Sequence, residues 1–343
     1  MAFGDMTDSE AIDAFCDWLH MAQGRSLRTL EVYRLALTRL GEFMRPRSIR
    51  EADGSELEAF TGLWLHKKGV VAQSRKPYVS AVRVFFGWAK MKGLLPADRN
   101  PAAEIAHPKT GRNIPRAMSL ASAERLMWAP DLGTFVGIRD AAMMALLMGC
   151  GLRVGGLCAL NEGDLQTVVV GREARMVVRV IEKGAKERLV PVPREADALL
   201  RVYLAHEDLA LIDRNTTNRR GKPDKVLFVN TKHPVLDEHE HIGEARRLHR
   251  RGVWGVIQRH GERVGIPPEE LHPHAMRHLF GTELTEEDVS LATTQELMGH
   301  ADPKSTKIYI TLSMRKKMRS VDQAAPLAKM RTPISEFLKR VPR

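Results

Sequence analysis

The stretch GLLPADRNPAAEIAHPKTGRNIPRAMS, residues 93–119, divides the chain into two halves of different character. It contains four prolines and two glycines. Proline removes a backbone hydrogen-bond donor and restricts the residue before it, so this stretch cannot form one continuous helix. We therefore predict a first domain over residues 1–100, a linker over 101–118, and a second domain with a C-terminal tail over 119–343.

The half before this stretch is predicted to be entirely helical. Its apolar residues recur every three or four positions, as Leu57, Phe60 and Trp64 do, and no segment alternates as a half-buried strand does. Ser26 stands where a helix cap is expected. The predicted helices form a small bundle and cover residues 9–20, 26–43, 55–67 and 74–92.

The half after this stretch mixes helices with β-branched runs, which predicts a fold that is mainly α with a small antiparallel β-sheet. Residues 210–224 are polar and predicted to be a flexible loop. Strands are expected over 168–170, 176–181 and 188–192, and helices near 119, over 139–148, 194–209 and 246–264, and from 274 onward.

The composition limits the class of protein. The chain has 343 residues, with 53 Lys and Arg against 42 Asp and Glu, a formal net charge of +11. Three cysteines without metal-ligand spacing argue against a disulfide scaffold and a cysteine-built zinc module. The longest apolar run, residues 141–149, is too short to span a bilayer, and the acidic N-terminus is unlike a signal peptide. We expect a cytoplasmic protein with no membrane partner, whose charge favours nucleic acid.

Five short segments of the second half contain residues that could take part in catalysis. Taken singly, each has an ordinary explanation: Arg153 as a surface arginine, Lys183 as a turn residue, His274 and His278 as a packing pair, and Tyr309 as a core residue. The pieces, in chain order, are GLRVGGLCAL, VIEKGAKERLVPVP, LHPHAMRHLFGTEL, LMGHADPKST and KIYI.

Together, in this order and spacing, the pieces resemble the tyrosine recombinase family, the phage-integrase-like site-specific recombinases, with a layout closest to the Xer-type members. The resemblance covers nearly the whole chain. It implies a helical core-binding domain, an interdomain linker at NPAAEIAHPK, and an α+β catalytic domain, which together form a clamp around DNA. The catalytic residues that it implies are Arg153, Lys183, His274, Arg277, His300 and the nucleophile Tyr309.

The resemblance also implies a chemistry that suits these residue types. The tyrosine hydroxyl attacks a phosphodiester, and the resulting 3′-phosphotyrosyl bond allows religation without ATP. Arg153 and Arg277 would neutralise the phosphate oxygens with paired donors, and His300 would add one donor. His274 is the candidate acceptor of the tyrosine proton, and Lys183 the candidate donor to the leaving 5′ oxygen. No cofactor and no metal ion is expected, because arginines supply the positive charge.

The partner expected from the resemblance is double-stranded DNA with specific recombination sites. The protein would act on two sites as a homotetramer, or as a heterotetramer with a related recombinase, associated with the nucleoid. The use would be integration, excision or resolution of DNA elements. The segment after Pro326 is either exchanged between subunits or packed within its own chain. Basic residues expected to contact DNA are Arg25, Arg28, Arg34, Arg75, Lys76, Arg83, Lys304 and Lys307.

Some features depart from the family pattern or compete with this interpretation. His272 either contacts DNA or packs, the segment GTELTEEDVS is unusually acidic, and Gly155 and Gly156 are poor helix formers just after Arg153. The patterns DEHEH and HAMRH resemble metal sites without a full ligand set. The alternative functions are a topoisomerase-like enzyme that cuts and reseals, and a non-catalytic DNA-binding protein.

Overall fold

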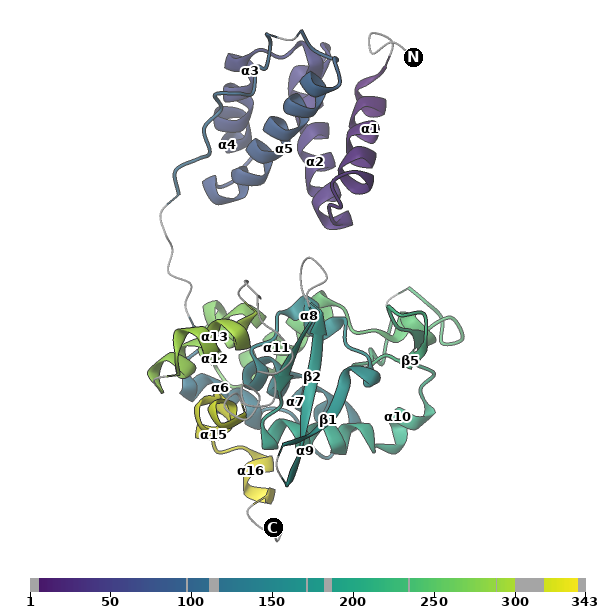
Figure 1. Cartoon of the computed structure of the whole chain (residues 1–343), viewed down its shortest axis with the longest axis vertical. Coiled ribbons are helices and arrows are strands. Elements are labelled where there is room, and N and C mark those ends of the chain that lie inside the picture. Colours follow the sequence, from purple (N-terminus) through teal and green to yellow (C-terminus); the bar gives the residue numbers. More distant parts are fainter. Residues whose placement is uncertain are drawn as a thin grey trace. The chain divides into compact units, whose positions relative to one another are not determined.

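The computed structural model divides the chain into two compact units, with the boundary between Asn113 and Ile114, and each unit has its own hydrophobic core (Figure 1). The structure describes residues 6–96, 98–110, 117–170, 172–181, 187–233, 235–287, 289–299 and 318–338.

The first unit is a bundle of helices closed by aromatic side chains. Three helices begin at side-chain caps, from Thr7, Ser26 and Asp53. At the centre, the ring of Phe15 lies edge-on to Phe85 with centroids 5.4 Å apart. The elements are α1 (Asp8–Met21), α2 (Leu27–Met44), η2 (Ile49–Glu51), α3 (Gly54–Ala59), the π-helical turn η3 (Phe60–Trp64), α4 (Leu65–Lys67) and α5 (Ala72–Met91).

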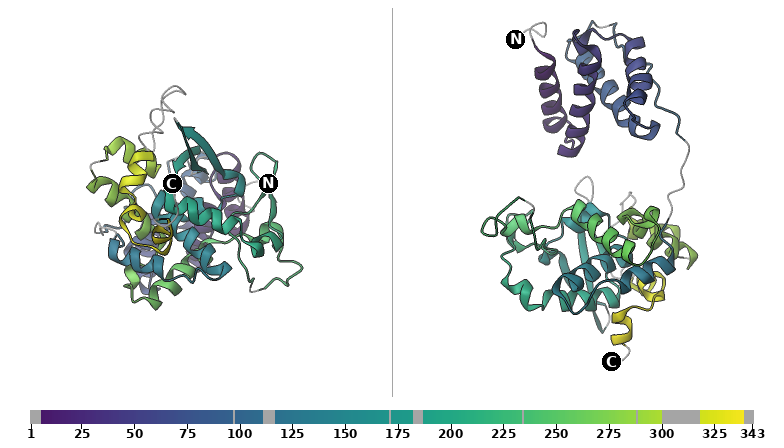
Figure 2. Two further views of the ribbon diagram at one scale, coloured as in Figure 1. Left: turned by 90° about the horizontal axis from the view of Figure 1, so that it is seen from below. Right: turned by 180° about the vertical axis from the view of Figure 1, so that it is seen from behind.

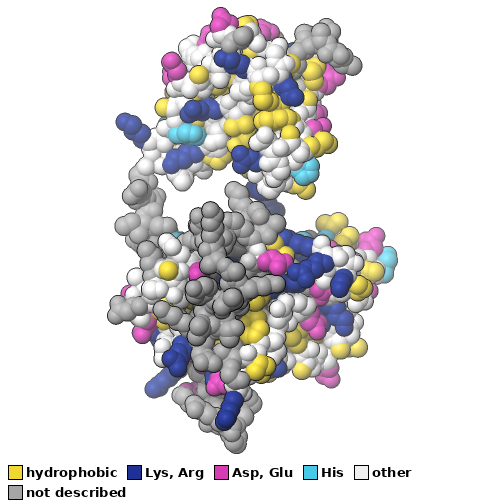
Figure 3. Space-filling view, in the orientation of Figure 1, with side chains coloured by type: hydrophobic (Ala, Val, Ile, Leu, Met, Phe, Trp, Pro, Cys, Tyr) yellow, Lys and Arg dark blue, Asp and Glu magenta, His cyan; other side chains and the backbone are white. Residues whose placement is uncertain are grey.

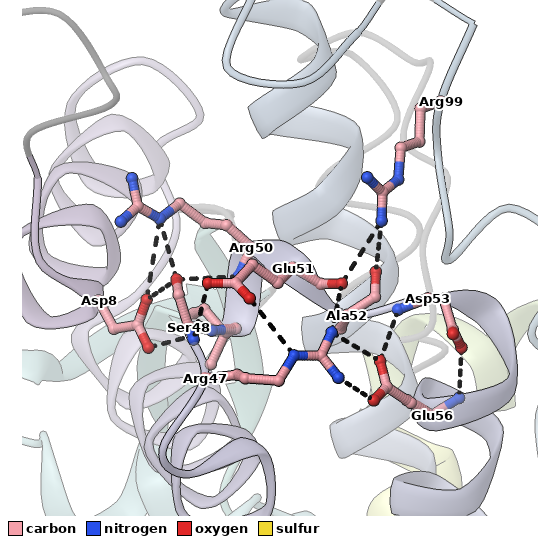
Figure 4. A network of polar contacts seen from close by, with 10 residues as sticks. Asp8, Arg47, Ser48, Arg50, Glu51, Ala52, Asp53, Glu56 and Arg99 are labelled. Atoms are coloured by element: carbon pink, nitrogen blue, oxygen red, sulfur yellow. Dashed lines mark hydrogen bonds and ion pairs between the residues drawn. The ribbon is translucent and has the colours of Figure 1, made fainter.

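A polar network ties the start of α1 to η2 and α3 (Figure 4). The carboxylate of Asp8 accepts hydrogen bonds from the Ser48 hydroxyl at 2.5 Å and the Ile49 amide at 3.0 Å. Arg47 then pairs with Glu56 at 2.6 Å. The two bonds to Asp8 join segments that are 40 and 41 residues apart in the chain.

Residues 99–110, which lie within the proline-rich stretch, pack on the helices of the first unit. Ala102 and Ile105 are buried in its core. The side chains of α5 hold the segment, because Arg83 donates to the Ile105 carbonyl at 3.3 Å and Lys76 to the Thr110 hydroxyl at 2.5 Å. Part of the expected linker is therefore bound to the first unit.

The second unit is built around α7 (Phe135–Cys150), which is buried on all sides. Its charged residues are paired inside the core: Arg139 contacts Asp140 at 2.6 Å, and Asp140 contacts His260 at 2.9 Å. The other helices in the described part of this unit are α6 (Leu120–Trp128), α8 (Val154–Cys158), η4 (Glu162–Asp164), α9 (Arg194–Leu204), α10 (Glu207–Leu211), η5 (Gly243–Arg246), α11 (Arg250–Arg263), η6 (Pro268–Glu270), α12 (Pro273–Glu286), α13 (Leu291–Met298), α15 (Pro326–Lys329) and α16 (Pro333–Leu338).

A three-stranded antiparallel sheet in the order β1-β2-β3 lies beside this core. Its strands are β1 (Leu165–Val170), β2 (Glu173–Ile181) and β3 (Glu187–Pro191). The register pairs Val178 with both Leu165 and Val190. The predicted class, mainly helical with a small antiparallel sheet, is confirmed.

The prediction of a loop over residues 210–224 is wrong in part. β4 (Asn215–Thr217) pairs with β5 (Pro223–Lys225) in a two-stranded antiparallel ribbon. Both strands are polar and three residues long, so hydrophobic alternation gave no signal for them.

The C-terminal segment 318–338 packs on the second unit of its own chain, and its yellow helices lie against that unit in both further views (Figure 2). Asp322 accepts two hydrogen bonds from Arg175 at 2.6 and 2.5 Å. Lys329 contacts Glu283 at 2.6 Å and Glu287 at 2.9 Å, so the acidic end of α12 has a basic partner.

Within the described residues, no helix combines the length and the apolar character that crossing a membrane requires.

Candidate active site of the second unit

The turn between α7 and α8 places Arg153. Gly151 ends α7 with φ of 57°, in the left-handed region. A Cβ at this position would lie 2.3 Å from Cδ1 of Phe280, a buried residue of α12. Glycine is therefore required for two reasons, and the turn that it forms against α12 puts Arg153 at the cap position of α8.

The start of α12 places His274. The ring Nδ1 of His272 accepts a hydrogen bond from the Ala275 amide at 2.9 Å, and Pro273 is the first helical residue. His272 is thus a helix cap, a role that the sequence did not suggest. His274 follows in the first turn and is exposed, while His278 is half-buried one turn later.

Arg277 joins three elements with one side chain. It is 5% exposed, and its two terminal nitrogens donate to the carbonyls of Gly151 and Met298. The first carbonyl belongs to the α7–α8 turn, and the second is the last of α13. A guanidinium is a planar fork with several donors, so it can hold both acceptors at once.

A second arginine, Arg188, binds the C-terminal end of α13. Arg188 of β3 donates to the Leu297 carbonyl at 2.5 Å. The final carbonyls of a helix lack partners within it and carry partial negative charge, so cations are favoured there. Gly299 then ends α13 with φ of 66°. Sequence reasoning missed Arg188 and assigned it only to a strand.

The arginines make the site strongly positive. Burial, together with repulsion by Arg153 and Arg188, lowers the pKa of Arg277 to about 9. Burial lowers the pKa of Arg188 to about 10. Burial, and then repulsion by Arg188, also lowers the pKa of Arg153. All three remain charged at neutral pH, so the site is prepared to receive an anion, which would relieve their repulsion.

His274 lies in the same field. The side chain is exposed but partly desolvated by its surroundings, which lowers its pKa below the usual value, and the neighbouring His272, His278, Arg277 and Arg153 lower it further. The ring is therefore neutral at pH 7 and able to accept a proton.

The two glycines after Arg153 are explained by close packing. A Cβ at Gly155 would lie 2.4 Å from Nη2 of Arg250, and one at Gly156 would lie 3.1 Å from a methyl group of Val180. Poor helix formers are used here because α11 and β2 approach α8 closely.

The structure brings together three of the six residues expected to be catalytic: Arg153, His274 and Arg277 surround one site, joined by Arg188. Ile181 and Glu187, which flank the expected position of Lys183, pair across β2 and β3. Lys183, His300, Tyr309, Lys304 and Lys307 lie outside the described residues.

Comparisons with known proteins show the family of this chain. A model described as "Phage integrase family" matches residues 116–316, and one described as "Phage integrase, N-terminal SAM-like domain" matches residues 12–93. Tyrosine recombinase XerD of Pseudomonas putida is 32% identical over 303 residues, which cover 88% of this chain and 92% of that protein. The chain belongs to the phage integrase family. It is a tyrosine recombinase, an enzyme of the site-specific DNA recombinase class. The family resemblance predicted from the sequence is confirmed.

Further relatives extend this result. Tyrosine recombinase XerC of Chromobacterium violaceum is 30% identical over 323 residues, which cover 94% of this chain and 96% of that protein. The structure of XerH recombinase bound to palindromic difH substrate has a TM-score of 0.64 and 17% identity, and the match covers 92% of this chain and 84% of XerH. A lambda integrase dimer bound to a COC' core site has a TM-score of 0.60 and 17% identity, over 88% of this chain and all of that one (100%). These structures share the fold.

In the first unit of this recombinase, most basic residues expected to contact DNA have partners within the chain. Arg28 pairs with Glu31, Arg34 with Asp13, and Arg75 donates to the Gly62 carbonyl. Lys76 and Arg83 hold the segment 99–110, as described above, and the Arg25 side chain is exposed. The two ion pairs are exposed and contribute little to stability.

Neither metal-like pattern forms a metal centre among the residues that the structure describes, where no three His, Cys, Asp or Glu side chains gather around a common point. In the pattern DEHEH, the ring of His241 is buried and its Nδ1 lies 3.1 Å from Nη1 of Arg246. In HAMRH, His278 is one of the neighbours that lower the pKa of His274.

The turn at Gly151 makes a first prediction. We expect Gly151→Ala to lower the free energy of unfolding by about 2–5 kcal/mol, since alanine meets both left-handed strain and the ring of Phe280. Gly265→Ala is the matched control, because Gly265 also has positive φ, of 67°, but open space around its Cβ position. Urea unfolding measures both. Equal losses in the two variants would show that contact with Phe280 does not constrain the turn.

Proposed function

We propose that this recombinase cleaves and rejoins DNA at specific sites through a covalent 3′-phosphotyrosyl intermediate formed by Tyr309. The observation that supports it is the convergence of three arginines. Arg277 and Arg188 donate to the last two carbonyls of α13, and Arg277 also binds the turn that places Arg153. A phosphodiester in this site would relieve the repulsion and gain bidentate hydrogen bonds.

The arginines stabilise the transition state in this mechanism. When the tyrosine oxygen attacks, negative charge increases on the non-bridging oxygens of the phosphorus. Donors already fixed in place stabilise that charge without reorganisation, and Arg277 is fixed by its bonds to Gly151 and Met298. These guanidinium groups supply the charge neutralisation that a metal ion supplies in other phosphoryl-transfer enzymes.

Proton transfer completes the reaction. The hydroxyl of Tyr309 must lose a proton, and the neutral ring of His274 is the proposed acceptor. Lys183 donates the proton that the leaving 5′ oxygen needs, and His300 donates a hydrogen bond to the phosphate. Religation reverses these transfers, so the bond energy is kept and ATP is not required.

The proposed partner is double-stranded DNA carrying two recombination sites, held by a tetramer of this chain or of this chain with a related recombinase. A lambda integrase tetramer bound to a Holliday junction is among the structures similar to this chain, with a TM-score of 0.59. We propose a core-binding domain over residues 1–100, a linker over 101–118 and a catalytic domain over 119–343, which clamp DNA of the nucleoid. The use would be integration, excision or resolution of DNA elements. The proposed DNA contacts outside the catalytic set are Arg25, Arg28, Arg34, Arg75, Lys76, Arg83, Lys304 and Lys307.

The covalent step gives a direct test. DNA recovered with the protein from cells, prepared as nicked suicide substrates, should form an adduct that survives a denaturing gel. We expect Tyr309→Phe to abolish the adduct, because the variant lacks the attacking oxygen. Tyr33→Phe, in the first unit, is the matched control and should retain it. An adduct that persists in Tyr309→Phe, or an unaltered protein that forms none with any recovered DNA, would refute the mechanism.

The pH dependence of cleavage tests the role of His274. The base acts in its neutral form, which is present above its pKa, and that pKa lies below the ordinary value of 6.5. The single-turnover rate should therefore fall as the pH is lowered, with the midpoint of this fall below pH 6.5.

Removing a neighbouring side chain that lowers the pKa of His274 should move this fall in rate along the pH axis. His278→Gln is expected to raise the pKa of His274 and shift the fall in rate to higher pH, while His66→Gln in the first unit should leave the profile unchanged. An acid limb above pH 7 in the unaltered protein would contradict the assignment of His274 as the base.

A further inference from the structure

The segment between β4 and β5 forms a turn held by its own hydrogen bonds. The Asn218 amide donates to the Lys222 carbonyl at 2.9 Å. The Asn218 side-chain oxygen accepts from the amides of Arg220 at 3.0 Å and Lys222 at 3.1 Å. Gly221 supplies the left-handed residue that the turn requires, with φ of 71°. Residues 218–222 are called the basic turn below.

The base of this ribbon is anchored to the second unit. Oδ1 of Asp224 accepts from the Gly163 amide at 3.0 Å, and its Oδ2 accepts from the Asn218 side chain at 3.3 Å. Arg214 is buried and contacts Glu162 at 2.6 Å and the Val226 carbonyl at 2.9 Å. The acidic residue of the ribbon is thus used internally, and the ribbon has a fixed position in its unit.

The basic side chains of the ribbon point outward. Arg219, Arg220, Lys222 and Lys225 are all exposed. Figure 3 shows Lys and Arg side chains gathered on the second unit in the region that lies between the labels α8 and β5 of Figure 1. A fixed turn with exposed basic side chains binds anions without a large loss of backbone entropy.

The basic turn lies beside elements that carry the catalytic residues. Arg219 and Arg220 line one small cleft together with Gly156 of α8 and Ile181 of β2. Helix α8 begins directly after Arg153. Nη2 of Arg220 lies 3.4 Å from Oε1 of Glu187, which is paired with Ile181 at the base of the hairpin whose connecting residues include Lys183.

We propose that the basic turn is an additional DNA-backbone site of this recombinase, in which Arg219 and Arg220 bind phosphates of the same duplex that enters the active site. This inference rests on the proposed function. The Arg220–Glu187 pair is exposed on both sides, at 62% and 45%, so it is weak and is readily exchanged for a phosphate. Contacts of this kind position DNA against the Lys183 hairpin without reading its sequence.

The salt dependence of DNA binding tests this proposal. Binding of the full chain to a 40-base-pair duplex of arbitrary sequence would be measured by fluorescence anisotropy between 50 and 200 mM KCl. Each lost phosphate contact lowers the magnitude of the slope of log Kobs against log salt by about 0.9. We therefore expect Arg219→Gln/Arg220→Gln to lower it by about 1.8, so that its loss of affinity is about tenfold larger at 50 mM than at 200 mM.

Two further variants sharpen the result. Arg194→Gln/Arg201→Gln removes two arginines of α9 that are equally exposed, at 61% each, and should leave the slope within error of the unaltered protein. Glu187→Gln removes the carboxylate that competes for Arg220, so it should bind the duplex more tightly. Circular dichroism melts check that each variant is folded.

The outcomes separate this proposal from the one on which it rests. If the Arg219→Gln/Arg220→Gln variant has the same slope and affinity as the unaltered protein, the basic turn is not a DNA site. The basic turn would then be available to an acidic protein partner. An unaltered protein that binds the duplex and still forms no adduct with any recovered DNA would overturn the proposed chemistry alone. An unaltered protein that binds no DNA would overturn both.

Discussion

The two hydrogen bonds that Arg277 donates, to the carbonyls of Gly151 and Met298, are the constraint on which the active site depends. One bond fixes the turn that presents Arg153, and the other fixes the end of α13. Helix α7 ends at Gly151 and helix α13 ends at Gly299, both with positive φ. The residues after each glycine are outside the helix, so the hydrogen bonds within the helix do not hold them in place. A single buried side chain therefore sets the relation between α7, α12 and α13, and any displacement of it would move Arg153.

The arrangement of the three arginines lowers the stability of the unbound protein and favours the binding of an anion. Arg277, Arg153 and Arg188 repel one another, and burial deprives them of water, as their lowered pKa values record. Helix-end carbonyls offset part of this unfavourable energy. The remainder is available to a bound phosphate, because an anion removes the repulsion on binding. Preorganised positive charge thus links the packing of the second unit to the chemistry proposed for it.

The sequence predicted the features that depend on local patterns and motifs, and it did not predict the features that depend on contacts between residues far apart in the chain. Periodicity predicted α1, α2 and α5, with the cap of α2 at Ser26, and motif order predicted that Arg153, His274 and Arg277 would share a site. Arg188 was missed because its role depends on the Leu297 carbonyl, 109 residues later. The ribbon of β4 and β5 was missed because Asn218 and Asp224, rather than apolar alternation, hold it. The roles of Lys183, His300 and Tyr309 stay predictions.

Amide hydrogen exchange followed by mass spectrometry on Arg277→Lys tests the central claim, that the Arg277 fork holds these segments together. Lysine keeps the charge but lacks the planar fork that reaches both carbonyls. We predict faster exchange in peptides covering residues 149–158 and 291–299, with peptides of α9 unchanged, because the loss is local. Unchanged protection of both segments, or an equal increase throughout the second unit, would contradict the claim.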